Sequence, residues 1–88
     1  MNRNEEFHKT TFKNKRAIIN HNGGWCGYCG KGSKAKEISY LTESDNEQTA
    51  VCPHCDTDCV IPAYRDMHGR HLVSAENIEE FQRYWFGK

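Results

Sequence analysis

The sequence predicts a small α+β domain that is stabilised by a bound metal ion. Three observations support this fold class. The chain has only 88 residues, four of its five cysteines form two Cys-x-x-Cys pairs, and short strand-like segments between and after these pairs precede an amphipathic helix. We expect one domain unit at residues 25–88, preceded by a basic arm or helix at residues 1–24.

Length and composition explain why a metal ion is needed. A chain of this size with 36% hydrophobic residues buries a small core, so a covalent or metal cross-link is expected. Twelve basic residues balance twelve acidic ones, which argues against a strongly electrostatic nucleic-acid binder. The first residues contain no apolar run, so we expect no secretory signal, no membrane span and a cytoplasmic location.

Residues 4–20 read as a polar helix, in which Phe12, Arg16 and Ile19 share one side. Two asparagines and two glycines, in the segment 20–24, form a strong stop signal. A partly frayed basic arm is an equally acceptable interpretation of residues 1–24.

The first Cys-x-x-Cys pair, Cys26 and Cys29, predicts a zinc knuckle. In such turns the backbone N–H groups just past each cysteine point at the sulfurs, which requires an unusual backbone angle at the residue after the second cysteine. Gly30 adopts that conformation freely, and Asp56 adopts it better than most residues after Cys55. The two pairs are therefore expected to form the same structural element.

The segment 37–52 predicts a β-hairpin with a polar turn at residues 44–47. Its second strand delivers Cys52 to the site. The apolar segment 59–64 predicts a third strand that stops at Pro62, and residues 65–71 predict an exposed loop.

Ser74 is placed to cap a final helix over residues 75–86. We expect three side chains of one helix face to be buried against the sheet: Ile78, Phe81 and Trp85. The sheet side of this core is expected to consist of Ile38, Tyr40, Val51 and Val60.

The two pairs together predict a closed Cys₄ site for Zn²⁺, with the ligands Cys26, Cys29, Cys52 and Cys55. Four protein sulfurs leave no coordination position for water or substrate, so the site is expected to be structural and the protein not an enzyme. A structural zinc supplies ~10–16 kcal/mol of apparent binding free energy. Folding and metal binding are therefore expected to be one event.

Two other uses of these cysteines are open. Cys52 and Cys55 with His68 and His71 imitate a Cys₂His₂ finger, although two residues between the histidines are fewer than usual. Thiol–disulfide exchange is the other alternative, but its folds need a long helix after the second cysteine, where this chain has glycines or a β-branched run. Cys59 is expected to be a small buried hydrophobe, with an exchangeable fifth ligand or exposed thiol as the alternative.

Two segments support a family resemblance: Cys52-Pro-His-Cys-Asp-Thr-Asp-Cys-Val-Ile61 and Phe81-Gln-Arg-Tyr-Trp-Phe86. Together with the aromatic-flanked first pair, they resemble a group of small uncharacterised bacterial cytoplasmic zinc-ribbon proteins over residues 25–86. The chain departs from their pattern at Asp56 and Pro62, where glycine is usual. The resemblance implies a zinc ribbon and no established activity, and it marks Asp58 only as a pattern residue.

We therefore expect a non-enzymatic zinc-finger protein that recognises another macromolecule, with another protein preferred as the partner and no small-molecule substrate. Nucleic-acid binding is the alternative, with Trp25 or Tyr28 as the stacking platform. The basic residues for that alternative are Arg3, Lys9, Lys13, Lys15, Arg16, Lys31, Lys34 and Lys36.

Overall fold

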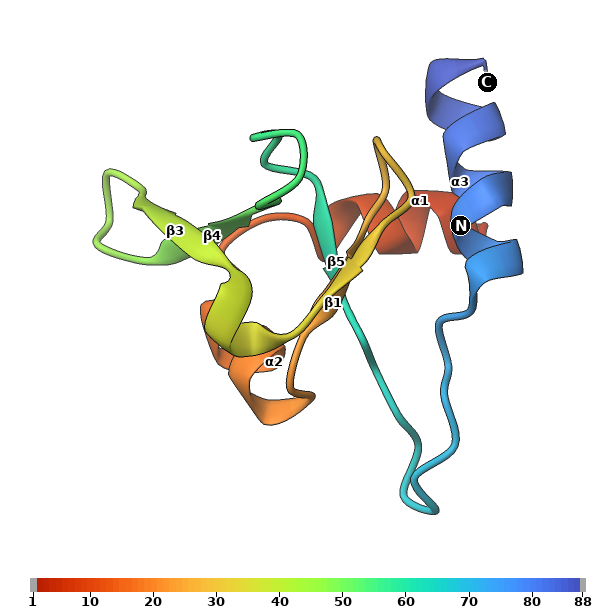
Figure 1. Ribbon diagram of the computed structural model, residues 1–88, viewed down its shortest axis with the longest axis horizontal. Coiled ribbons are helices and arrows are strands. Elements are labelled where there is room, and N and C mark those ends of the chain that lie inside the picture. The colour runs from red at the N-terminus through yellow and green to blue at the C-terminus, as the bar shows by residue number, and fades with distance from the viewer. Residues whose placement is uncertain (1, 88) are drawn as a thin grey trace.

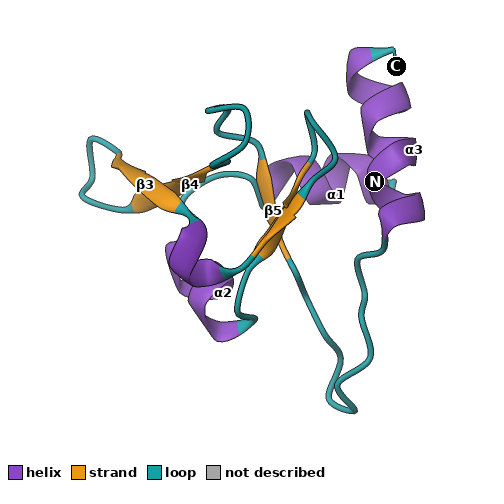
Figure 2. Cartoon of the chain, viewed as in Figure 1, coloured by secondary structure: helices purple, strands orange, loops and turns teal. Residues whose placement is uncertain are grey.

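A computed structural model describes residues 2–87 as a small α+β fold with helices at both ends of the chain (Figures 1 and 2). The elements in chain order are α1 (Arg3–Lys9), α2 (Lys15–Asn20), β1 (Gly24–Cys26), β2 (Gly32–Ser33), the short 3-10 helix η1 (Ala35–Glu37), β3 (Ser39–Thr42), β4 (Gln48–Val51), β5 (Val60–Pro62) and α3 (Ala75–Phe86). None of the helices in this part of the chain is long and apolar enough to span a membrane.

The strands form two separate antiparallel sheets, of order β2-β1-β5 and β3-β4. The predicted hairpin is confirmed, with Ser39 opposite Val51 and Thr42 opposite Gln48. The predicted third strand is present as β5 and ends at Pro62, but it pairs with β1 and not with the β3–β4 hairpin. A side chain at Gly24 would meet the carbonyl oxygen of Ile61 at 2.6 Å, so the close approach of these two strands requires glycine.

The amino-terminal segment is two helices, and the prediction of one helix over residues 4–20 is wrong. Asn2 caps α1 by accepting a hydrogen bond from the N–H of Glu5 at 2.9 Å. The hydroxyls of Thr10 and Thr11 donate back to carbonyl oxygens of the preceding turn, both at 2.7 Å, and such bonds compete with the helical ladder. Lys13, with a φ of 49°, then turns the chain into α2.

Neither α1 nor α2 is a frayed arm, because α2 packs against β4 and β5 and α1 packs against α3. The amide of Asn14 donates to the carbonyl oxygens of Thr10 at 2.8 Å and Val60 at 2.7 Å, and its oxygen accepts from the N–H of Ala50 at 2.9 Å. Ile18 is fully buried. One polar side chain thus joins the end of α1 to both sheets.

The core consists of two apolar clusters that meet at β5. Because successive residues of a strand face opposite ways, Val60 packs with Ile18, Ile38 and Ala50 around the cysteines, and Ile61 belongs to the other cluster. The second cluster is made of Cys59, Ile61, Val73, Ile78 and Phe81. The prediction that the α3 residues pack against Ile38, Tyr40, Val51 and Val60 is therefore wrong.

The final helix begins and ends as predicted. The side chain of Ser74 accepts a hydrogen bond from the N–H of Asn77 at 3.3 Å, and Ile78 and Phe81 are buried. Trp85 was expected to be buried as well, but it is 40% exposed. Its Nε1–H donates to the carbonyl oxygen of Asn4 at 3.0 Å, so the indole fastens α1 to α3 instead of filling the core.

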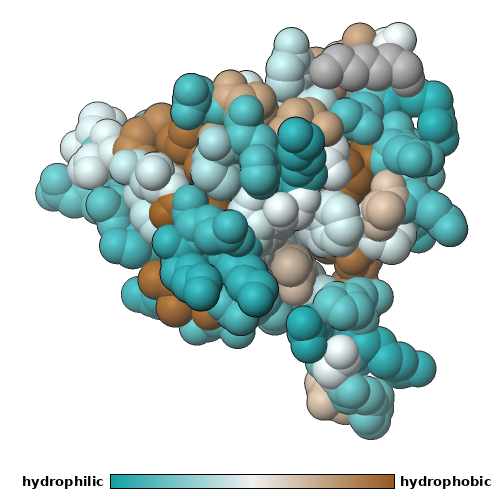
Figure 3. All heavy atoms as spheres, viewed as in Figure 1, coloured by the Kyte–Doolittle hydropathy of each residue, from teal (hydrophilic) through white to brown (hydrophobic). Residues whose placement is uncertain are grey.

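The chain between β5 and α3 runs out as a long loop that projects from the body of the molecule (Figure 1). The carboxylate of Asp66 shapes its tip by accepting from the N–H groups of His68 at 2.9 Å and Arg70 at 3.0 Å. The face shown in Figure 3 is mostly hydrophilic, with small apolar areas between polar side chains.

Candidate metal centre

The structure brings the four predicted ligands, Cys26, Cys29, Cys52 and Cys55, into one cluster. Their Sγ atoms all lie within 4.8 Å of one another. The Sγ atoms of Cys26 and Cys55 are 3.6 Å apart, and those of Cys29 and Cys52 are 3.7 Å apart. Sulfurs that surround Zn²⁺ tetrahedrally at ~2.3 Å lie about 3.8 Å from one another, so the cysteines present fit such an ion.

Backbone N–H groups in both turns point at the sulfur of the first cysteine of each pair. Tyr28 and Cys29 donate to the Sγ of Cys26, each at 3.4 Å. In the second turn the N–H of His54 donates to the Sγ of Cys52 at 3.4 Å. These bonds orient the sulfurs and stabilise negative charge on them, and they confirm the knuckle geometry expected from the spacing.

The residue after each second cysteine adopts the left-handed backbone that the spacing predicts. Gly30 has a φ of 83° and Asp56 a φ of 60°. In each turn this residue donates its N–H to the carbonyl oxygen of the first cysteine, Gly30 to Cys26 and Asp56 to Cys52, both at 2.9 Å. The two pairs are therefore the same structural element used twice.

Strand pairing brings the two turns together. The first turn closes the β1–β2 hairpin, where the N–H of Cys26 donates to the carbonyl oxygen of Lys31 at 2.9 Å. The second turn follows β4, and the chain then returns as β5 with Val60 opposite Cys26. Pairing of β1 with β5 thus fixes the start of the first knuckle relative to the end of the second.

The cluster is partly shielded from solvent. Cys26 and Cys52 are each only 1% exposed, whereas Cys29 and Cys55 are half-buried. Burial raises the pKa of the Cys26 and Cys52 thiols. Burial also opposes ionisation of Cys55, but hydrogen bonds with Thr57, Cys26 and Cys52 together outweigh it and lower its pKa to about 7. Cys55 therefore ionises more readily than an ordinary cysteine, and a cation at the centre would favour ionisation of all four thiols.

The other candidate ligands lie outside the cluster. Within residues 2–87, the four cysteines form the one group of three or more potential metal-binding side chains, so His68 and His71 do not join Cys52 and Cys55. Cys59 is 8% exposed in the second apolar cluster, and burial raises its pKa to about 11. It is the small buried hydrophobe expected from the sequence.

Two residues that support the site were missed by sequence reasoning. Thr57 helps to lower the pKa of Cys55 through hydrogen bonds. A threonine two residues after a cysteine is common, so the sequence alone does not indicate this role. Gln82 of α3 donates its side-chain N–H to the carbonyl oxygen of Tyr28 at 2.8 Å, which ties the helix to the first knuckle.

Searches against models of protein families, curated proteins and solved structures gave no match to this chain.

Proposed function

We propose that the four cysteines hold one structural Zn²⁺ and that this ion joins the two knuckles into a single folding unit. The observation that supports this most strongly is the set of sulfur–sulfur distances of 3.6 and 3.7 Å between the two pairs. An all-thiolate tetrahedral set suits zinc among the common biological cations. Without an ion, the buried sulfurs of Cys26 and Cys52 have only weak donors around them.

We also propose that the fold is a zinc ribbon related to the small bacterial cytoplasmic proteins that the sequence resembles. The two equivalent knuckles, the β3–β4 hairpin between them and the terminal α3 agree with that pattern. The unusual φ of Asp56 is the conformation that the usual glycine would adopt at the same place.

The proposed role of the site is structural rather than catalytic. Four protein sulfurs saturate a tetrahedral ion. Thiol–disulfide exchange is not favoured either, because Cys29 is followed by β2 and Cys55 by β5, and neither cysteine begins a helix.

The partner that we propose for this module is another protein. Tyr28 and Phe86 form an edge-to-face pair with ring centroids 5.1 Å apart, and they are 39% and 41% exposed. The pair lies at the first knuckle, so the bound ion would hold Tyr28 in place for a partner. Exposed aromatic residues on a rigid support are typical of the centres of protein interfaces.

The zinc proposal is tested by metal analysis of purified protein and of two matched alanine variants. We expect one zinc per chain in the wild type, loss of zinc and of the folded spectrum in Cys52→Ala, and retention of both in Cys59→Ala. Retention of zinc by Cys52→Ala would contradict the proposed ligand set.

The protein-partner proposal is tested with Phe86→Ser. A protein that binds the wild type should no longer bind this variant, although the variant keeps its zinc. Continued binding of that protein to Phe86→Ser would refute the proposal.

A further inference from the structure

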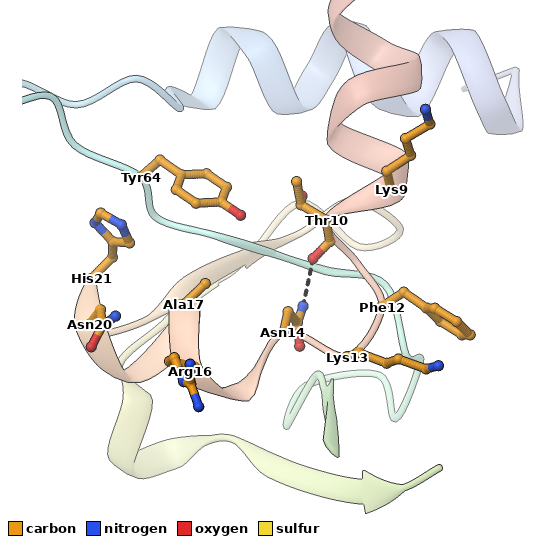
Figure 4. A pocket seen from close by; sticks show the side chains of 10 residues that line it. All are labelled: Lys9, Thr10, Phe12, Lys13, Asn14, Arg16, Ala17, Asn20, His21 and Tyr64. Carbon is orange, nitrogen blue, oxygen red and sulfur yellow. Dashed lines mark hydrogen bonds between the residues drawn. The ribbon is translucent and has the colours of Figure 1, made fainter. Parts of the chain in front are cut away.

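A basic hollow lies on the surface formed by the end of α1, by α2 and by the chain just after β5 (Figure 4), and the proposed protein-binding pair is not part of its lining. Its volume is about 440 Å³, and none of the residues that line it is acidic. The chain as a whole has no net charge, so this surface concentrates positive charge that is balanced elsewhere.

Three cationic side chains stand at the rim of the hollow: Lys9, Lys13 and Arg16. Lys13 is paired with Asp45 at 2.6 Å. Lys9 and Arg16 are exposed and form no ion pair with any residue in the described range. Both are therefore available to contact an anionic ligand, and their long side chains can move toward it.

An exposed aromatic ring lies between two of these cations. Phe12 is 56% exposed, and the Nζ of Lys13 is 5.5 Å from the centre of its ring. The same ring also borders a second hollow of about 330 Å³, to which Lys9 and Thr11 contribute. A large exposed ring beside cationic side chains is the arrangement on which unpaired nucleic-acid bases stack.

The floor of the hollow is held rigidly. Its central residue is Asn14, whose three hydrogen bonds reach the end of α1 and both sheets. On the far side His21 packs edge-to-face against Tyr64, with ring centroids 5.1 Å apart. The rim residues thus project from a fixed base, which reduces the conformational cost of binding.

We propose that this hollow binds the phosphodiester backbone of single-stranded nucleic acid, with Lys9 and Arg16 contacting phosphates and Phe12 stacking on a base. Paired bases have no free face for Phe12, and cations spread along an open rim suit a chain of phosphates better than one small anion. The stacking residue differs from those expected from the sequence: Trp25 packs against the second apolar cluster, and Tyr28 belongs with Phe86 to the proposed protein-binding pair.

The test is fluorescence anisotropy of a labelled 12-nucleotide single strand of mixed sequence, as RNA and as DNA, with zinc-loaded protein at two salt concentrations. We expect binding that weakens with salt. Replacing both Lys9→Glu and Arg16→Glu should weaken binding about tenfold or more and reduce the slope of log K against log salt by about 1.4. Phe12→Ala should weaken binding about fivefold or more, and Phe12→Trp should restore it.

The matched control is the double variant Lys31→Glu and Lys36→Glu, two exposed lysines that lie outside the hollow and together receive the same change of charge. It should change the affinity less than about twofold. Each variant is checked for its zinc content first. Equal loss of binding in the control would refute the proposal. The proposal would also be refuted if the protein bound no single strand at low salt, or if it bound a duplex more tightly. It would equally be refuted if an acidic peptide bound as tightly as the single strand, or if inorganic phosphate displaced the strand at the strand's own concentration.

Discussion

The ring of Phe81 packs directly on the Cα of Gly27. A β-carbon at Gly27 would lie 2.4 Å from Cε1 of that ring and 3.2 Å from the sulfur of Cys59. The glycine inside the first knuckle is therefore the point at which α3 packs against the metal centre.

Gly27→Ala should destabilise the zinc-loaded protein by about 1–3 kcal/mol, because the buried ring has no room to move. The measurement is urea unfolding followed by tryptophan fluorescence. Gly32→Ala is the matched control, since its β-carbon would make an ordinary 3.5 Å contact with Trp25. Equal stability of the two variants would show that α3 is not packed on the knuckle.

Asn14→Ala should destabilise the fold by about 2–4 kcal/mol. The substitution removes three hydrogen bonds and leaves the N–H of Ala50 and the carbonyl oxygen of Val60 buried without their partner. Asn20→Ala, at the exposed end of α2, should change the free energy of unfolding by less than about 0.5 kcal/mol. A similar small effect at Asn14 would mean that the amino-terminal helices are not fastened to the sheets in solution.

Asp56→Gly should keep the zinc site and stabilise the protein by up to about 1 kcal/mol, because glycine adopts a φ of 60° without steric cost. Asp56→Val should do the opposite, since a β-branched residue is strained there. Thermal unfolding of both variants gives the comparison. A lower midpoint for Asp56→Gly than for Asp56→Val would contradict the equivalence of the two knuckles.

The pair formed by Lys13 and Asp45 predicts a pH dependence on the alkaline side. The hydrogen bond between them is the main cause that raises the pKa of Lys13 above 10.5 and lowers the pKa of Asp45 below 3.8. A raised lysine pKa means stabilisation that is complete below pH 10.5 and lost as the pH rises through the folded-state value. Asp45→Asn should therefore be slightly less stable than the wild type near pH 7, and the difference should shrink above pH 10.5 and disappear once the pH exceeds the raised pKa of Lys13. The effect is small because both groups are exposed. A stability difference that persists when Lys13 is deprotonated would exclude the ion pair as its cause.

The metal-binding cluster could be predicted from the sequence because its signals are local. Each pair needs only its own spacing and the residue after it, here Gly30 and Asp56. The limits of α3 were predictable for the same reason, since Ser74 caps the helix and the spacing of Ile78 and Phe81 marks its buried face.

The pairing of β1 with β5 could not be predicted in this way. It joins residues 24–26 to residues 60–62, and each strand is too short to show a pattern of its own. The structure of the core depends on this pairing, because it directs Val60 and Ile61 to different clusters. Trp85 was misplaced because helical spacing identifies a face and does not reveal that α1 lies beside it.

X-ray absorption at the zinc K-edge tests the central proposal most directly, because it counts the atoms bound to the ion. The account predicts four sulfur ligands at ~2.3 Å and none of nitrogen or oxygen. A first coordination shell that contains histidine nitrogen or water oxygen would contradict the closed four-cysteine site and the structural role that follows from it.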